Sequence, residues 1–417
     1  MTTYKFLKTK WYYGMKSLKK DDISRTITLR IDKNYIQEFR DKFNIDDRQE
    51  FSYDKGQKDD TEFDISDCPS HKNDDDIYVK NPNIKVIFKN KDEVDDFSKK
   101  FDKPITDKAR TVWYPKQVLS KKYPKNSYWT TEVECVNQYP IYIVSYKRSD
   151  KLQTVKSLLY CGVKNFYIVI KNDKTEIENY TKSLKELGVE DKLLIVPDDF
   201  SEDEEKIGDL NSIPQRNYSY IHSVENGDKY HWCLDDNIKD FFRREDGQKT
   251  KMKTGFMFYF VEEFMKRYTN VNLSSLQYNH LVPAGGYRGM IVKNSKVYSC
   301  ILIKNSNNIM WRGSYNEDII LTLDTLLENK GTMTFQNFLC GKQSTGTTKG
   351  GNQDIYKSDG QQKKIDFLMS VHPKYTKEII KYGHPHHQVN YKPFKDNDLG
   401  YTPIKLNFPE LILRTEE

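Results

Sequence analysis

The chain has 417 residues, which is enough for one large domain with an appendage or for two domains. Its 67 Lys and Arg residues against 61 Asp and Glu residues give a formal net charge of +6, which is too small to identify a polyanionic partner by itself. Only 36% of the residues are hydrophobic, but 29 Tyr and 21 Phe residues predict a real core that is rich in aromatic side chains.

Cysteine usage and hydropathy argue against several protein classes. The six cysteines include no CxxC pair and have no regular spacing, so neither a disulfide framework nor a zinc site is indicated. The N-terminal stretch lacks the apolar segment of a signal peptide, and no run approaches the roughly 20 apolar residues of a membrane span. We therefore expect a soluble protein of the cytoplasm. No membrane partner and no obligate protein partner are indicated.

The first part of the chain, residues 1–135, has weak periodicity. Strand-forming runs occupy residues 25–31, 84–90 and 111–119, and charge-dense stretches separate them. This pattern predicts a small α+β accessory module.

A regular alternation of strands and helices begins near residue 139. Buried strands are expected at residues 140–146, 165–171, 192–197 and 229–234, and helices at residues 150–162, 174–188 and 212–224. Asp150 is the expected cap of the first helix, and Pro214 lies in the first turn of the third. The alternation predicts that residues 136–417 form one α/β domain, a mostly parallel sheet flanked by helices.

The fourth of these strands ends in three adjacent polar residues, Asp235, Asp236 and Asn237. In open α/β sheets, ligands bind beyond the carboxyl ends of the strands. Carboxylate and amide oxygens at such an end suit Mg²⁺ or Mn²⁺ bound together with a substrate diphosphate, while a solvated polar turn is the alternative on the tripeptide alone. The first strand ends at the same edge, so its following residues are further candidates for the ligand site: Ser145, Tyr146 and Arg148.

Several other segments carry candidate functional residues. Arg216 lies near a helix N-terminus, where an anion would be favoured, although a surface ion pair is the alternative. Glu317 and Asp318 open a helix, either as ordinary partners of its dipole or with one of them as a general base. The preceding aromatic segment, which includes Trp311, would line a pocket.

Two later segments carry further candidates. Residues 383–394 hold three histidines, which are either a surface tract or ligands for a metal or phosphate. Residues 341–361 are rich in Gly, Ser and Thr and have no apolar period, which predicts a mobile loop.

The motifs PIYIVSYKR, QRN, WCLDDNI, YNEDIILTL and HHQVNYKPF, in this order, resemble the TET-associated glycosyltransferases. These are GT-A-fold enzymes of phages, large DNA viruses and some eukaryotes that glycosylate hydroxymethylated pyrimidines in DNA. The resemblance extends from about Tyr139 to Phe394. It implies a GT-A-like, Rossmann-related fold, a UDP-sugar donor, a divalent cation (Mn²⁺ or Mg²⁺) and DNA with a hydroxymethylated pyrimidine as acceptor.

The resemblance also implies roles for individual residues. Asp318, or less favourably Glu317, would be the base of an inverting transfer. The nucleotide sugar would be bound by Ser145, Tyr146, Arg148, Arg216, Asn217, Asp235 and Asp236, and the metal by Asp235, Asp236, Asn237 and His386 or His387. The family's acidic helix usually continues with a second acid and an aromatic residue, where this chain has Ile320 and Leu321. If that second acid contacts the acceptor sugar or base in the family, the donor or acceptor of this chain would differ from the family's.

DNA binding with a flipped base would need aromatic and basic side chains. The candidates are Arg243, Arg244, Tyr287, Arg288 and Trp311, with Lys16, Lys19 and Lys20 near the N-terminus. Three alternatives stay open at this point. They are a glycosyltransferase for protein or glycan acceptors, a nucleotidyltransferase and a non-catalytic DNA-binding scaffold. A nucleotidyltransferase would need a further acidic metal ligand on a neighbouring strand.

Overall fold

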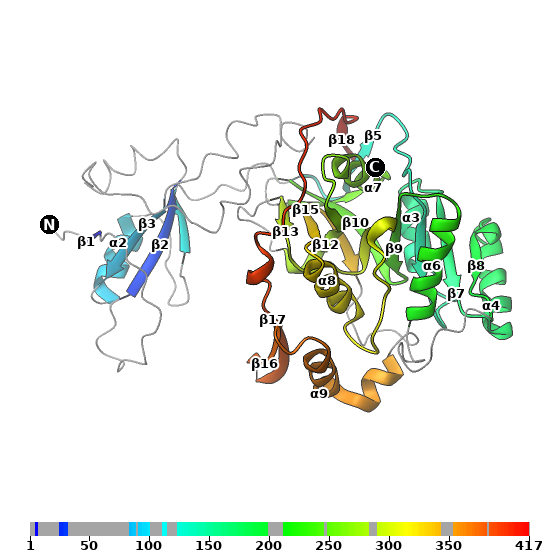
Figure 1. Ribbon diagram of the computed structural model, residues 1–417. Helices are drawn as coiled ribbons and strands as arrows, with labels where there is room; N and C mark the ends of the chain where they lie inside the picture. The colour runs from blue at the N-terminus through cyan, green and yellow to red at the C-terminus, as the bar shows by residue number, and fades with distance from the viewer. Residues whose placement is uncertain are drawn as a thin grey trace. The chain divides into compact units, whose positions relative to one another are not determined.

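The computed structural model describes residues 5–6, 25–31, 83–88, 91–100, 111–114, 123–198, 212–245, 248–282, 290–342, 353–381 and 383–416 (Figure 1). The chain divides into two compact units. One contains the described elements before residue 115, and the other contains everything from Tyr123 onward. The second unit therefore begins earlier than residue 136, where the sequence had suggested the boundary.

The N-terminal unit is a small sheet with one described helix. Its strands are β1 (Lys5–Phe6), β2 (Arg25–Ile31), β3 (Asn83–Phe88) and β4 (Thr111–Tyr114), in the order β1-β3-β2-β4. Helix α2 (Lys91–Lys100) buries Val94 and Phe97. Strands at all three predicted positions, together with this helix, make the unit α+β.

The second unit is built on a mixed sheet of twelve strands, whose main path is β18-β5-β11-β10-β15-β12-β14-β9-β6-β7-β8, with β13 paired to β15. The strands are β5 (Ser127–Thr131), β6 (Ile141–Val144), β7 (Phe166–Ile170), β8 (Leu193–Ile195), β9 (Tyr230–Asp235), β10 (Ile238–Glu245), β11 (Gln248–Met252), β12 (Val271–Tyr278), β13 (Ile291–Lys293), β14 (Cys300–Lys304), β15 (Gly331–Lys342) and β18 (Leu411–Thr415). The prediction of a mostly parallel sheet is correct for β9-β6-β7-β8 and wrong for the sheet as a whole, because β10 and β14 run antiparallel to their neighbours. The chain turns directly from β9 into β10, and the sequence pattern did not reveal the strands that follow this turn.

Strand direction decides which residues meet at one edge of the sheet. Strands β6 and β9 are parallel. Strand β14 is antiparallel to both β9 and β12, so β9 and β12 point the same way, and β15 is parallel to β12. The carboxyl ends of β6, β9, β12 and β15 therefore lie at the same edge, although these strands are far apart in the sequence.

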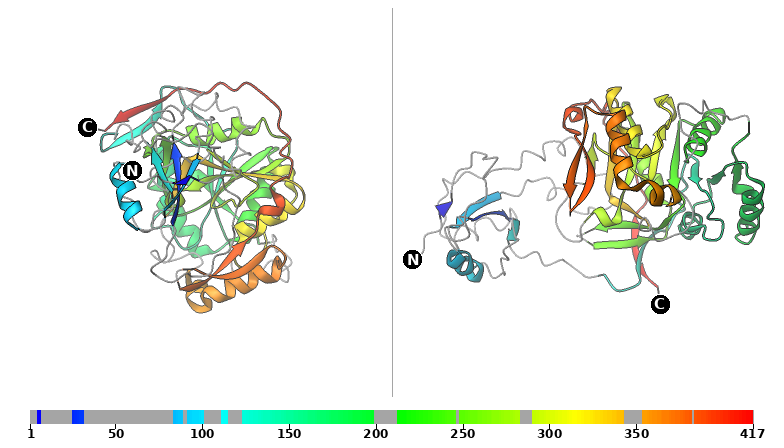
Figure 2. Two further views of the ribbon diagram at one scale, coloured as in Figure 1. Left: turned by 90° about the vertical axis from the view of Figure 1, so that its left-hand side faces the viewer. Right: turned by 90° about the horizontal axis from the view of Figure 1, so that it is seen from below.

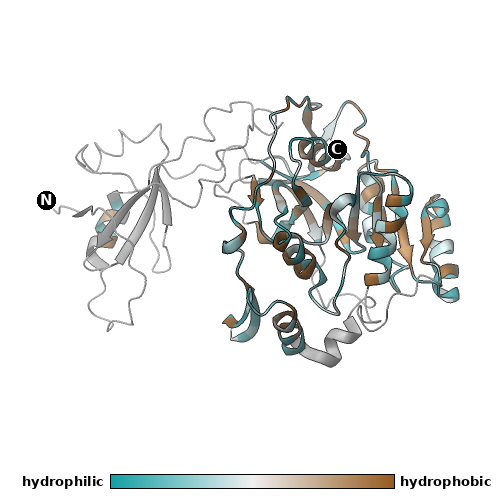
Figure 3. Ribbon diagram, viewed as in Figure 1, coloured by the Kyte–Doolittle hydropathy of each residue, from teal (hydrophilic) through white to brown (hydrophobic). Residues whose placement is uncertain are grey.

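Helices cover both faces of this sheet. The described helices of this unit are α3 (Gln153–Tyr160), α4 (Lys174–Lys185), α6 (Ile213–Glu225), α7 (Phe256–Met265), α8 (Glu317–Leu327) and α9 (Gln353–Val371). Neighbouring residues of β9 point to opposite faces. Trp232 packs edge-on against Phe258 of α7, while Cys233 packs in a cluster with residues of α6 and α8. The apolar strands therefore lie between helices (Figure 3).

Short 3₁₀ turns and a hairpin complete the described elements: η5 (Glu190–Lys192), η6 (Asn279–Leu281), η7 (Asn305–Asn307), η8 (Lys392–Phe394), β16 (Thr376–Lys381) and β17 (His384–Val389). Strands β16 and β17 form a separate antiparallel pair beside α9 (Figures 1 and 2). None of the described helices is long and apolar enough to cross a membrane.

Two local predictions need correction. Helix α3 begins at Gln153, and its N-cap is Leu152 in the left-handed region with no side-chain cap, so Asp150 is not the cap. The predicted loop over residues 341–361 is wrong at both ends, because Gly341 and Lys342 belong to β15 and residues 353–361 begin α9. Residues 343–352 lie outside the described part of the chain. Helix α9 packs through buried Ile365 and Leu368 near its C-terminal end. The first half of the helix is polar, so the sequence pattern did not indicate a helix there.

Candidate active site at the carboxyl edge of the sheet

The Asp235-Asp236-Asn237 segment ends β9 and turns directly into β10. Thr154, in the first turn of α3, fixes the backbone of this turn from both sides. Its hydroxyl donates to the carbonyl of Asp235 over 2.6 Å and accepts from the amide of Ile238 over 2.9 Å. The amide of Thr154 also donates to the carbonyl of Asp236 over 3.3 Å. The polar tripeptide is therefore a turn, as one reading of the sequence suggested, and it is held in place by a neighbouring helix.

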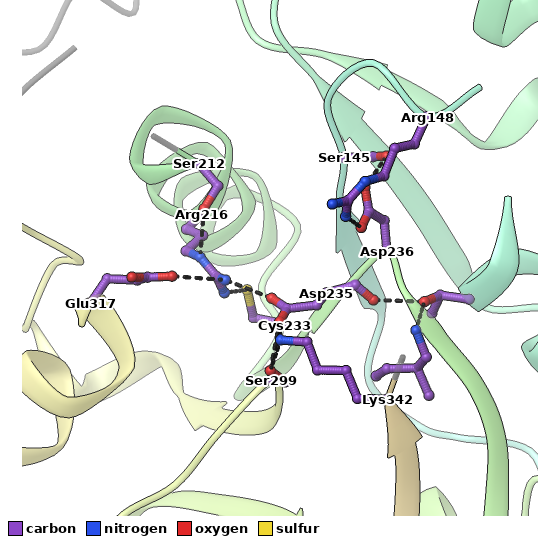
Figure 4. Close-up of polar contacts among 12 residues, drawn as sticks. Ser145, Arg148, Ser212, Arg216, Cys233, Asp235, Asp236, Ser299, Glu317 and Lys342 are labelled. Atoms are coloured by element: carbon purple, nitrogen blue, oxygen red, sulfur yellow. Dashed lines mark hydrogen bonds and ion pairs between the residues drawn. The ribbon is translucent and has the colours of Figure 1, made fainter. Parts of the chain in front are cut away.

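Asp235 accepts hydrogen bonds from three other elements (Figure 4). One carboxylate oxygen accepts from Arg216 of α6 over 2.7 Å. The other accepts from Ser299, just before β14, and from Lys342, the last residue of β15, each over 2.5 Å. Burial opposes ionisation, but the charges of Lys342 and Arg216 outweigh it and hold the pKa of Asp235 well below its usual range. Asp235 is therefore a firmly ionised carboxylate that joins α6, β9, β14 and β15.

Asp236 points to the other side, toward the end of β6. Its carboxylate accepts from the Ser145 hydroxyl over 2.7 Å and forms an ion pair with Arg148. The hydroxyl of Tyr180, from α4, lies 2.6 Å from that of Ser145 and accepts from the backbone amide of Arg148. Burial raises the pKa of Asp236, against the opposing effects of Arg148 and Ser145. The structure thus brings together Ser145, Arg148 and Asp236, while the neighbouring Tyr146 is exposed.

Arg216 is buried, with a side chain only 2% exposed. Its guanidinium donates to Ser212 over 3.0 Å, to the Cys233 sulfur over 3.2 Å and to Asp235, and it stacks on the Trp311 ring at 4.4 Å from the centroid. Arg216 therefore lies at the strand edge as expected, with its donors directed at groups of the chain itself.

Asn217 connects the same helix to the segment before α8. Its side-chain amide donates to the Trp311 carbonyl over 3.0 Å, and its oxygen accepts from the Trp311 amide over 2.8 Å. This two-bond clamp fixes the backbone that leads to Glu317 and Asp318. In the described structure Asn217 is a positioning residue for that segment.

Glu317 and Asp318 open α8 and have different surroundings. A carboxylate oxygen of Glu317 lies 3.6 Å from the Arg216 guanidinium. For Asp318, Oδ1 is buried and has no hydrogen-bond partner in the described part of the chain. Burial, and then the charge of Glu317, raises the pKa of Asp318 to about 7, against the opposing charges of Arg216 and Lys342. Asp318 is therefore a carboxyl group that changes its protonation state near neutral pH.

The side chains that were expected to bind a metal are neutralised by cations of the chain. Arg216 and Lys342 hold Asp235, Arg148 holds Asp236, and Arg216 also lies beside Glu317. Each of these carboxylates is thus already paired with a cation of the chain, which competes with a divalent cation for the same oxygens. Asn237 Oδ1 is the one oxygen of the tripeptide side chains that is buried without a partner in the described structure. In this arrangement the residues do not fit Mn²⁺ or Mg²⁺.

The two histidines proposed as further ligands lie on β17. The structure records no hydrogen bond or ion pair from the described His386 or His387 to the Asp235-Asp236-Asn237 turn. Burial lowers the pKa of His387, and the charges of His386, Lys296 and Lys364 lower it further. These neighbours would repel a bound cation. The described His, Cys, Asp and Glu residues likewise form no group of three or more that could hold a metal ion.

The expected DNA contacts have mixed outcomes. Arg243 is only 1% exposed and stacks on Trp129 and Phe338, so it cannot reach a phosphate in this arrangement. Trp311 is also buried, beneath Arg216, and does not offer a face to a flipped base. Arg244 is partly exposed on β10, and Tyr287 and Arg288 lie outside the described residues. The positions of the family's second acid and aromatic residue, Ile320 and Leu321, are core positions here.

The structure adds four residues that sequence reasoning missed: Thr154, Tyr180, Ser299 and Lys342. Ser299 has a positive φ of 49° and is fully buried, but a single serine between apolar residues gives no signal in a sequence. Lys342 had a detectable signal. It ends the long apolar run of β15, and a lysine at the carboxyl end of a buried strand is unusual.

A comparison with known protein families identifies the family of this chain. The chain matches the sequence profile of the TET-Associated Glycosyltransferase family over residues 139–351, a range that contains the Asp235-Asp236-Asn237 turn, Arg216 and the start of α8. No curated protein matches the chain. Because the profile covers more than half of the chain and spans the site, this protein is a member of the TET-associated glycosyltransferase family.

Proposed function

We propose that the protein transfers a sugar from a UDP-sugar to the hydroxymethyl group of 5-hydroxymethylcytosine, or of another hydroxymethylpyrimidine, in DNA. Family membership supports glycosyl transfer and a link to modified DNA. The finer elements of the proposal are the GT-A-like fold, the uridine nucleotide, the modified base and the residue roles that follow. The N-terminal unit, in this proposal, is an accessory module for DNA contact.

The observation that carries the proposal is the contrast between two adjacent acids. Glu317 lies against Arg216 and serves to keep that guanidinium in place. Asp318 has a buried oxygen without a partner in the described structure and a pKa of about 7. A general base is most effective when its pKa is near the working pH and one of its oxygens is available for the substrate proton. The pKa of Asp318 meets the first condition, and no other described group forms a hydrogen bond with its Oδ1.

The proposed reaction is an inverting displacement. The hydroxymethyl oxygen attacks C1 of the sugar, and its proton moves to an oxygen of Asp318. The bond between C1 and the diphosphate oxygen breaks, and its electron pair leaves with UDP. The base must be correctly placed as well as ionised, and the Asn217 clamp on Trp311 supports that placement, because it fixes the segment before α8.

A transferase for a glycan or protein acceptor uses the same donor chemistry and is the second candidate. It differs from the favoured function only in the acceptor. The available support for DNA is the family relationship, and the buried Arg243 and Trp311 contribute nothing to an acceptor surface.

The test of the mechanism is a matched pair of isosteric substitutions. Asp318→Asn keeps the size of the side chain and removes the base, so turnover should fall by about 10²–10⁴ with UDP binding nearly unchanged. Glu317→Gln should have a smaller effect. If Glu317→Gln abolished turnover while Asp318→Asn retained it, Glu317 would be the base. A product that kept the donor's anomeric configuration would contradict the inverting mechanism.

A further inference from the structure

We propose that Lys342 supplies the positive charge for the donor's diphosphate, so that the enzyme binds and turns over its nucleotide sugar without a divalent cation. This inference rests on the proposed function, because it assigns a residue to the nucleotide diphosphate of that reaction. A diphosphate leaving group needs its developing negative charge balanced, by a metal or by a fixed cation of the protein.

The position of Lys342 is set by the sheet. It is the last residue of β15, whose carboxyl end lies at the same edge as the ends of β6 and β9. Its ammonium donates to Asp235 over 2.5 Å and to the Ser299 hydroxyl over 2.9 Å, and it lies over the Tyr278 ring at 5.7 Å from the centroid. The ammonium is therefore held from three sides at the place where sequence patterns led us to expect a metal (Figure 4).

A comparison of the three cations at the site favours Lys342. The Arg216 side chain is 2% exposed, and its donors are directed at Ser212, Cys233 and Asp235. The Arg148 side chain is 14% exposed and pairs with Asp236. The Lys342 side chain is 23% exposed, and its ammonium carries three hydrogens, of which two are used within the described structure. Lys342 is thus the cation with the most access to a ligand, and the third hydrogen is the group that we assign to the diphosphate.

Lys342 and a divalent cation exclude one another here because both would bind the carboxylate of Asp235. A metal bound to Asp235 would lie within a few ångströms of the Lys342 ammonium and would have to displace it, because both compete for the same carboxylate oxygen. The Asp235 oxygen that accepts from Lys342 also accepts from Ser299, so both acceptor positions of that oxygen are filled. While Lys342 pairs with Asp235, this carboxylate therefore does not bind a metal.

The experiment measures UDP binding to the full chain by titration calorimetry, once in buffer with excess EDTA and once with Mn²⁺. The wild-type dissociation constant should agree within about twofold between the two buffers. Lys342→Met should weaken binding in EDTA by about tenfold or more, the loss expected for one ionic hydrogen bond to phosphate. Lys342→Arg should lie between the two. The matched control is Lys164→Met, which removes an 81% exposed lysine before β7 and should bind UDP as the wild type does.

A rescue arm separates a direct role from a structural one. Lys342→Met leaves Asp235 short of one positive charge, so Mn²⁺ should strengthen UDP binding by this variant more than by the wild type. A wild type that bound UDP only with Mn²⁺, or a folded Lys342→Met variant that bound UDP normally in EDTA, would overturn the inference while leaving the proposed function intact. Failure of the wild type to bind UDP in either buffer would overturn the proposed donor site as well. The wild-type comparison tests metal independence without any variant, and Lys342→Arg tests the role of the residue even if Lys342→Met does not fold.

Discussion

At the scale of single residues, two neighbouring acids with the same sequence signal have different environments. Glu317 and Asp318 both open α8, and acids in a first helical turn are ordinary partners of the helix dipole. The contact of Glu317 with Arg216 and the partnerless oxygen of Asp318 come from packing between α6 and α8. The sequence could therefore identify Glu317 and Asp318 as candidate bases, and the family resemblance could favour Asp318. Only the tertiary structure shows the physical difference between the two side chains.

The pKa of Asp318 leads to a prediction for the pH dependence of the reaction. A base must be ionised to accept a proton, and burial raises the pKa of Asp318 to about 7. As pH falls through 7 the carboxylate is protonated, so kcat/KM should fall toward a tenfold loss per pH unit and should level off above pH 7. Steady-state rates between pH 5.5 and 8.5 measure this profile. The residual rate of Asp318→Asn should lack the acidic limb, and a flat wild-type profile across this range would contradict the assignment of the base.

At the scale of elements, the sequence predicted the part of the site that follows local patterns. The apolar strands β6, β7, β8 and β9, the helices α4 and α6, and the polar turn after β9 were all found near their predicted positions. Ser299, just before β14, and Lys342, at the end of β15, reach the site from segments that are distant in sequence. Their contribution depends on the mixed order and direction of the strands, and no local pattern encodes that order.

The N-terminal turn of α3 offers a test of how this edge is held. Thr154→Val keeps the side-chain shape and removes both hydroxyl hydrogen bonds to the Asp235-Asp236-Asn237 turn, leaving the Ile238 amide without its partner. We expect a loss of about 1–3 kcal/mol in the free energy of unfolding and a weaker apparent affinity for the donor. Chemical denaturation and donor KM measure the two effects.

The matched control is Thr181→Val, at an exposed position of α4. It should change the free energy of unfolding by no more than about 0.5 kcal/mol and should leave the donor KM unchanged. Equal effects of the two substitutions would mean that the Thr154 hydroxyl does not hold the turn.

At the scale of the whole molecule, the chain is two compact units with separate described cores, Val94 and Phe97 in one and the twelve-stranded sheet in the other. Every described residue of the candidate site belongs to the second unit. Composition and periodicity alone indicated an α/β domain with an appendage. The ordered motifs were needed to identify the family, because function depends on a site and not on a fold class.

This division predicts that residues 123–417 fold and bind UDP like the full chain, because the site and its supporting strands are all contained in that unit. Affinity for DNA should fall if the N-terminal unit is the proposed accessory module. Thermal unfolding, UDP titration and DNA titration of the two proteins compare these properties. A fragment that folds but no longer binds UDP would show that the N-terminal unit contributes to the donor site.

The most direct test of the account uses two DNA duplexes of identical sequence, one with cytosine and one with 5-hydroxymethylcytosine. Each is incubated with the protein and a panel of UDP-sugars in excess EDTA and, separately, in Mn²⁺, and the digested nucleosides are weighed by mass spectrometry. The account predicts one sugar added to 5-hydroxymethylcytosine for each UDP released, in both buffers, and no addition to cytosine. An unchanged mass of 5-hydroxymethylcytosine under every condition, or transfer that occurs only in Mn²⁺, would contradict it.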